Sequence, residues 1–131
     1  MLIRLPSVLD RSELDSVRRL LASAAFVDGK LSAGLAAKRV KNNQEVDRGA
    51  REIEQLNNLL MNKLVQHPLY QSAALPLRIA APYYARYTSG MQYGEHVDDP
   101  VMGADGQLYR SDLAITIFLS DPSAYDGGEL A

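Results

Sequence analysis

Apolar residues recur at helical spacing in two segments of the first half of the chain. In the first segment, Glu13 follows Asp10 by three positions, a capping-box pattern that predicts a helix beginning after Asp10. The second segment predicts a helix from about Arg48 to Gln66, and Pro68 ends it near His67. The apolar faces of the two helices consist of Leu14, Val17, Leu20, Leu21 and Ala24, and of Ala50, Ile53, Leu56, Leu60 and Leu64.

The second half of the chain changes to the pattern of β-structure. Residues 75–90 are rich in β-branched and aromatic side chains, interrupted by prolines and a glycine as in short strands. Residues 92–99 predict a further strand, and residues 112–121, with the sequence DLAITIFLSD, predict the clearest strand of the chain. Helices that precede β-structure predict an α+β fold rather than alternating β-α-β units. Residues 1–70 are thus expected to be mainly helical and residues 71–131 to be rich in β-structure.

The chain stops just after a turn. The turn YDGGE, residues 125–129, leads into what resembles the start of a new strand, and Ala131 follows at once. Backbone groups at the start of a buried strand need hydrogen-bonding partners. We therefore expect residues 1–131 to be a single, incomplete domain that is an N-terminal fragment of a longer protein, or a chain completed by a partner. An unfinished sheet exposes an edge strand, so a homo-oligomer formed through this edge is a further expectation.

Composition narrows the classes of function. The 131 residues are 47% apolar and 23% charged, as in an ordinary soluble globular protein. A net charge of -2 argues against nucleic-acid binding, and the basic cluster Lys38, Arg39 and Lys41 is interpreted as a solvated loop or helix end. No apolar stretch is long enough to span a membrane and the N-terminus has no signal-peptide pattern, so we expect a cytoplasmic protein. The absence of cysteine excludes disulfides and thiolate metal sites.

His96 and Asp98 form the candidate site. In an extended segment, residues two positions apart project from the same face, so an imidazole and a carboxylate converge on one point. Two histidines and one carboxylate form the facial triad of non-haem ferrous oxygenases. The other histidine, His67, precedes Pro68 at a helix end and is interpreted as a surface or capping residue. A His-x-Asp pair occurs by chance in roughly one such sequence in six or seven, so the pair alone leaves a simple polar contact as an alternative.

The residues around this pair resemble a known family. In RYTSGMQYGEHVDDP, Tyr87, Gly90 and Tyr93 precede the His-x-Asp pair as in the prolyl 4-hydroxylase-like branch of the iron(II)/2-oxoglutarate-dependent dioxygenases. Residues 110–130 resemble the next long strand of that family and its Gly-Gly-Glu-Leu turn. The chain is most similar to the bacterial PKHD-type hydroxylases. Two earlier stretches also match these proteins: SAG at residues 32–34 and KNNQ at residues 41–44.

The resemblance implies roles for individual residues. His96 and Asp98 would be two iron ligands, while Tyr93 is interpreted as a core or rim residue. Tyr87 would make a polar contact to 2-oxoglutarate, or pack as a buried aromatic residue. Phe118 stands where some relatives have a tyrosine that binds the distal carboxylate of the cosubstrate, a bond that phenylalanine cannot donate. The same comparison puts the third ligand, a histidine, and the basic residue for 2-oxoglutarate beyond the end of this chain.

The resemblance also implies a fold and a reaction. The fold would be a double-stranded β-helix (jelly roll), of which this chain contains the N-terminal helices and the first half. The reaction would couple oxidative decarboxylation of 2-oxoglutarate to hydroxylation of a C–H bond, with Fe(2+) as cofactor, L-ascorbate as reductant and a substrate that the sequence does not identify. Residues 1–131 alone are expected to bind iron weakly and to be inactive. Two alternatives stay open: a non-enzymatic binding or regulatory module, and another cupin-type metalloprotein.

Overall fold

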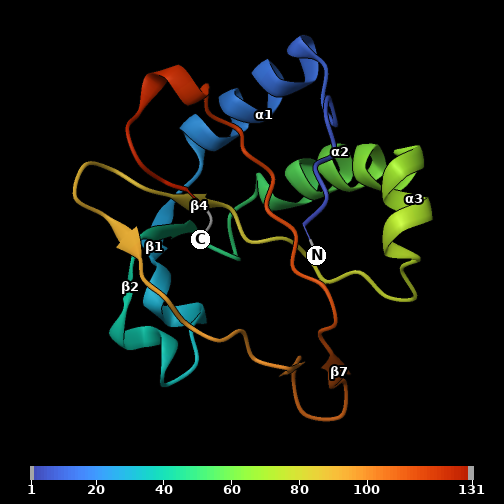
Figure 1. The fold of residues 1–131 in the computed structure, drawn as a ribbon. Coiled ribbons are helices and arrows are strands. Elements are labelled where there is room, and N and C mark those ends of the chain that lie inside the picture. Colours follow the sequence, from blue (N-terminus) through green and yellow to red (C-terminus); the bar gives the residue numbers. More distant parts are fainter. Residues whose placement is uncertain (1, 130–131) are drawn as a thin grey trace. The chain divides into compact units, whose positions relative to one another are not determined.

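The computed structural model describes residues 2–129, which divide into two compact units (Figure 1). The helical unit comprises the described residues of Met1–Val27 and Val46–Tyr84, and the β unit those of Asp28–Glu45 and Ala85–Ala131. The expectation of a single, incomplete oxygenase domain stays a prediction. None of the helices among the described residues is both long and apolar enough to cross a membrane.

The first helix, α1, spans Arg11–Ser23 and begins where the sequence predicts. Asp10 Oδ1 accepts a hydrogen bond from the Glu13 amide at 2.8 Å, and Glu13 Oε2 accepts one from the Asp10 amide at 2.9 Å. These two bonds confirm the capping box. Glu13 also pairs with Lys63 of α2 (Ile53–Gln66), and the bond from Lys63 lowers the pKa of the Glu13 carboxyl.

Pro68 separates two helices instead of closing the helical region. Helix α2 begins at Ile53, later than predicted, because residues 48–52 form turns before it. His67 is extended, with φ -71° and ψ 118°, as a residue before proline prefers. Pro68 is then the first residue of α3 (Pro68–Ala74), where its missing N–H costs no helical hydrogen bond. The apolar pattern of the sequence does not predict this third helix.

The apolar core of the described residues lies in the helical unit. Val17 of α1 and Leu56 of α2 are both 0% exposed. The remaining buried apolar residues are Val46, Leu60, Leu64, Tyr70 and Tyr84. Burial of Val17 on one helix, and of Leu56, Leu60 and Leu64 on the other, confirms the centre of each predicted face. The other predicted face residues are half-buried, and Ala24 and Ala50 lie outside the two helices.

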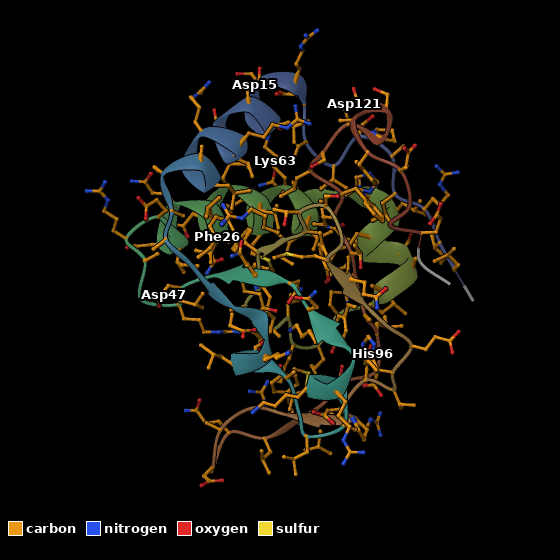
Figure 2. All side chains as sticks on the ribbon, turned by 90° about the vertical axis from the view of Figure 1, so that its left-hand side faces the viewer. Asp15, Phe26, Asp47, Lys63, His96 and Asp121 are labelled. Atoms are coloured by element: carbon orange, nitrogen blue, oxygen red, sulfur yellow. The ribbon has the colours of Figure 1, made fainter. Side chains whose placement is uncertain are left out.

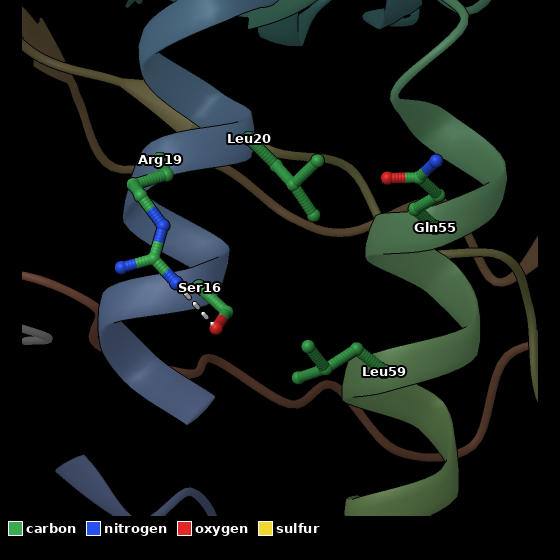
Figure 3. Close-up of a pocket in the computed structure, with 5 residues that line it drawn as sticks. All are labelled: Ser16, Arg19, Leu20, Gln55 and Leu59. Carbon is green, nitrogen blue, oxygen red and sulfur yellow. Dashed lines mark hydrogen bonds between the residues drawn. The ribbon is translucent and has the colours of Figure 1, made fainter. Parts of the chain in front are cut away.

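An open groove lies between α1 and α2 (Figure 3). Five residues line it: Ser16, Arg19, Leu20, Gln55 and Leu59. The guanidinium of Arg19 donates from Nη2 to Ser16 Oγ at 2.9 Å. Because this lining contains no histidine and no carboxylate, the groove is not a candidate metal site.

Tyr84 gives the helical unit a testable response to alkaline pH. Its side chain is buried, its hydroxyl donates to Asn57 Oδ1 at 2.9 Å, and burial raises its pKa to about 12. The folded-state pKa thus exceeds the value of about 10 expected in the unfolded chain, so this contribution to stability is complete below pH ~10 and is lost as pH rises through the folded-state pKa. Ultraviolet titration should show one phenolate step near pH 12 that Tyr84→Phe removes. Ionisation of every tyrosine well below that pH, in a protein that is still folded, would contradict this assignment.

The strands are short. Strands β1 (Phe26–Asp28), β3 (Gln44–Val46) and β4 (Ala85–Arg86) form a sheet in the order β1-β3-β4, in which β3 and β4 are antiparallel. Two antiparallel pairs complete the set: β2 (Lys41–Asn42) with β5 (Gln92–Tyr93), and β6 (Val101–Met102) with β7 (Tyr109–Arg110). Three turns of 3-10 helix also occur: η1 (Gly29–Ser32), η2 (Ala37–Arg39) and η3 (Pro122–Ala124). Three α-helices with small sheets confirm the α+β class.

One strand prediction is wrong and a second is wrong in extent. Residues 112–121 contain no strand, and residues 92–99 contain only the two residues of β5. A run of β-branched residues forms a strand only where a second strand accepts and donates its backbone hydrogen bonds. No described strand pairs with residues 112–121, and Leu113, Ile115 and Phe118 are exposed.

Candidate metal centre

Strand β5 carries the chain into the candidate site. Tyr93 lies opposite Lys41 of β2, and the amide of Gly94 donates to the carbonyl of Val40 at 2.9 Å. A Cβ atom at Gly94 would lie 3.2 Å from Val40 Cβ, so glycine permits this close approach. The chain bends at Glu95 and leaves the ladder there. His96 (labelled in Figure 2) and Asp98 therefore lie beyond the strand, and the alternation that the sequence predicts for them is wrong.

The two side chains nevertheless converge. His96 Nε2 lies 3.2 Å from Asp98 Oδ1, and His96 Nδ1 lies 2.7 Å from the carbonyl oxygen of Gly94. A carbonyl oxygen can only accept, so Nδ1 carries a hydrogen and a neutral imidazole then has its lone pair on Nε2. The side chain of His96 is 23% exposed and that of Asp98 is 67% exposed. The lone pair of His96 thus faces a carboxylate in a position that solvent can reach.

This geometry fits a divalent cation. Two adjacent ligands of an octahedral ion, each about 2.1 Å from it, are about 3 Å apart. A lone pair on Nε2 and a carboxylate oxygen repel one another at the observed distance unless a cation or a proton lies between them. A hydrogen bond from Nδ1 to a backbone carbonyl is also the usual orienting contact of a metal-binding histidine. His96 and Asp98 can therefore hold a metal, or form an ion pair when His96 is protonated.

The described residues supply only this pair. No group of three histidine, cysteine or carboxylate side chains among residues 2–129 could hold a metal ion. His67 belongs to the helical unit, where its Nε2 lies 3.1 Å from the carbonyl oxygen of Pro6. His67 lies between α2 and α3, but its side chain makes no capping hydrogen bond and instead contacts the segment that precedes α1.

Tyr93, which is interpreted from the sequence as a core or rim residue, contacts one of the candidate ligands directly. Its ring stacks on the imidazole of His96, with centroids 3.8 Å apart and planes inclined by 8°. The ammonium of Lys41 lies 5.1 Å from the centroid of the same ring. Burial, and after it the charge of Asp98, raises the pKa of the Tyr93 hydroxyl.

Lys41 is not the solvated residue that the sequence analysis predicts. Its ammonium bonds to Glu45 Oε1 at 2.5 Å and to Ser32 Oγ at 2.8 Å. The side chains of Lys41 and Glu45 are 7% and 9% exposed. No pattern in the sequence indicates this buried pair, because charged residues in a short segment usually face solvent.

Tyr87 has a defined hydrogen-bond partner. Its hydroxyl oxygen accepts from Asn43 Nδ2 at 2.9 Å, and Asn43 is buried. Tyr87 is 49% exposed, so it is not the buried aromatic residue of the alternative interpretation. Partial desolvation of its hydroxyl still raises the pKa of Tyr87, the bond from Asn43 opposes that rise, and the charge of Glu45 adds to it. Because Asn43 occupies one lone pair, the hydroxyl hydrogen of Tyr87 remains available to an acceptor.

Comparison with known proteins relates the segment that carries His96 and Asp98 to one group of proteins. The chain matches no protein-family profile. It is 49% identical over 130 residues to a PKHD-type hydroxylase of Thioalkalivibrio sulfidiphilus, 43% identical over 135 residues to one of Hyphomonas neptunium, and 40% identical over 132 residues to one of Gluconacetobacter diazotrophicus. Each match covers 99% of this chain and 58% of the relative. The chain is thus homologous, over nearly all of its own length, to part of the PKHD-type hydroxylases, as the resemblance of its motifs indicates.

Proposed function

We propose that this chain supplies two ligands of the catalytic centre of an Fe(II)- and 2-oxoglutarate-dependent hydroxylase. His96 and Asp98 are the proposed metal ligands and Tyr87 is the proposed contact to 2-oxoglutarate. The observation that carries the proposal is the convergence of His96 Nε2 and Asp98 Oδ1 at 3.2 Å while Nδ1 is held by the Gly94 carbonyl. The hydroxylase names of the relatives support it. In the proposed whole protein, the sheets of the β unit contribute to a jelly roll.

The residues of this chain would prepare the site in three ways. His96 presents the lone pair of Nε2, and its bond to Gly94 makes that nitrogen more basic and fixes its direction. Asp98 supplies a negative charge that favours a divalent cation. Tyr87 directs its hydroxyl hydrogen to a carboxylate, since Asn43 already donates to its oxygen. When bound, the iron and 2-oxoglutarate supply the oxidising chemistry that hydroxylates a substrate, and ascorbate keeps the iron reduced.

Residues 1–131 alone are expected to bind metal weakly and to be inactive. Two protein ligands leave most of the coordination positions of an octahedral ion to water, so we expect weak metal binding. The proposed third histidine and the basic partner of 2-oxoglutarate would lie in the part of the relatives that this chain does not cover, since it spans 58% of their length. We therefore expect no turnover of 2-oxoglutarate by residues 1–131.

A chain completed with the uncovered part of the relative from Thioalkalivibrio sulfidiphilus tests this proposal. With Fe(2+), ascorbate and 2-oxoglutarate, the completed chain should consume oxygen and form succinate, and His96→Ala should abolish both. His67→Ala in the same chain is the matched control and should leave both rates unchanged. Equal turnover by the His96→Ala variant would rule out the role assigned to His96. 2-Oxoglutarate-dependent oxygen consumption by residues 1–131 alone would instead contradict the expectation that this chain is inactive by itself.

A further inference from the structure

The buried residues of the β unit are mostly polar or charged, which is unusual for a protein interior. Apart from Gly29, the described residues of this unit that are buried are polar: Lys41, Asn43 and Glu45, at 6%, 4% and 7% exposure. Removal of charged groups from water is costly, and a buried ion pair is weak support for stability by itself. The position of this pair beside the candidate ligands points to a role there.

The pair reaches the site through Tyr93. Antiparallel pairing of β2 and β5 sets Lys41 opposite Tyr93, so the ammonium lies 5.1 Å from the ring centroid. That separation lies within the range of about 6 Å in which a cation is attracted to an aromatic ring. Glu45 and Ser32 hold the ammonium from other directions, at 2.5 Å and 2.8 Å. Lys41 is thus fixed by its own partners and favours one position of the Tyr93 ring.

Tyr93 in turn restricts the imidazole of His96. The hydrogen bond from Nδ1 to the Gly94 carbonyl sets the position of one ring atom, but it leaves the ring free to swing about that bond. The parallel stack on Tyr93, with centroids 3.8 Å apart, sets the plane of the ring. The two contacts together determine the direction of the lone pair on Nε2, which is what a metal bond requires.

We propose that Tyr93 is a positioning residue that fixes the ring plane of His96 for metal binding, and that the buried Lys41–Glu45 pair holds Tyr93 in place. This inference rests on the proposed role of His96 as a metal ligand. The feature that matters is a flat ring at position 93, because a flat ring defines a plane. The Tyr93 hydroxyl has no part in it.

Two substitutions separate ring shape from volume. Tyr93→Phe keeps a flat ring, whereas Tyr93→Leu keeps much of the apolar volume and loses the plane. Metal affinity of residues 1–131 is measured with Mn²⁺ by electron paramagnetic resonance, with folding checked by circular dichroism. We expect Tyr93→Phe to bind within about threefold of the unsubstituted protein and Tyr93→Leu to bind at least about tenfold more weakly. Tyr125→Leu, at a turn of the same unit, is the control and should not change the affinity.

A second readout needs no metal. The carbon-bound ring protons of His96 should show a ring-current displacement in the nuclear magnetic resonance spectrum, retained in Tyr93→Phe and lost in Tyr93→Leu. Equal Mn²⁺ affinity of these two variants would overturn the positioning role, and unchanged ring protons in Tyr93→Leu would overturn the stack itself. Failure of the proposed function gives a different result. The unsubstituted protein would then keep the ring-current displacement of the His96 protons but bind no metal at His96, and the positioning role would be overturned as well.

Discussion

Replacing His96 by alanine is expected to lower the affinity of residues 1–131 for Mn²⁺ on the order of 100-fold, because the substitution removes one of the two proposed protein ligands. Asp98→Asn should have an effect of similar size, since the amide keeps the shape of the side chain and removes its charge. The unsubstituted site has only two such ligands, so either loss should bring binding below detection in a titration followed by electron paramagnetic resonance.

Two control variants give this prediction its specificity. His67→Ala removes the other histidine, which contacts Pro6 in the helical unit, and should not alter the affinity. Asp99→Asn removes the adjacent carboxylate, which lies near Gly34, and should have at most a small effect through the lost charge. If His96→Ala bound Mn²⁺ as tightly as His67→Ala, the pair would be a polar contact, as a non-enzymatic module predicts.

Lys41→Met should destabilise the β unit by about 3–5 kcal/mol. The substitution leaves the carboxylate of Glu45 buried, at 7% exposure, without its cationic partner. A loss of this size is a large part of the stability of a small domain, so we expect the β unit to open readily. Hydrogen exchange at the Gly94 amide, which bonds to the Val40 carbonyl at 2.9 Å, reports this opening.

The double variant Lys41→Met/Glu45→Met distinguishes a lost partner from lost packing. Replacing both charges by apolar side chains should restore stability to within about 1 kcal/mol of the unsubstituted protein. Lys38→Met changes an exposed lysine of the same unit and is the matched control for charge. Similar exchange rates at Gly94 in the Lys41→Met and Lys38→Met variants would show that the buried pair does not support β5.

The helices could be predicted from the sequence because their causes are local. The capping box at Asp10 and the apolar stripe through Leu56 depend on residues within a few turns of one helix. The third helix was missed because a proline both ends one helix and begins another. The strand at residues 112–121 could not be judged locally, since a strand needs a partner and its own composition does not supply one.

In the candidate site, too, the local features could be predicted from the sequence and the contacts between distant segments could not. The identity of His96 and Asp98 could be predicted from their spacing and flanking residues, but not the means that brings them together. A bend after β5 and a hydrogen bond to the Gly94 carbonyl bring the two side chains together, rather than strand alternation. Lys41 and Tyr93 meet through antiparallel pairing of segments far apart in the sequence, so no local pattern reveals their contact.

Nitrogen-15 resonance of the histidine side chains shows whether His96 binds a divalent metal through Nε2. Zn²⁺ serves as a diamagnetic substitute for Fe(2+), and the chain contains only two histidines, which His67→Ala distinguishes. We expect Zn²⁺ to shift the Nε2 resonance of His96 to that of a metal-bound nitrogen, while Nδ1 keeps its hydrogen and His67 does not respond. A Zn²⁺ titration that leaves His96 unchanged, or that shifts His67 alone, would contradict this expectation.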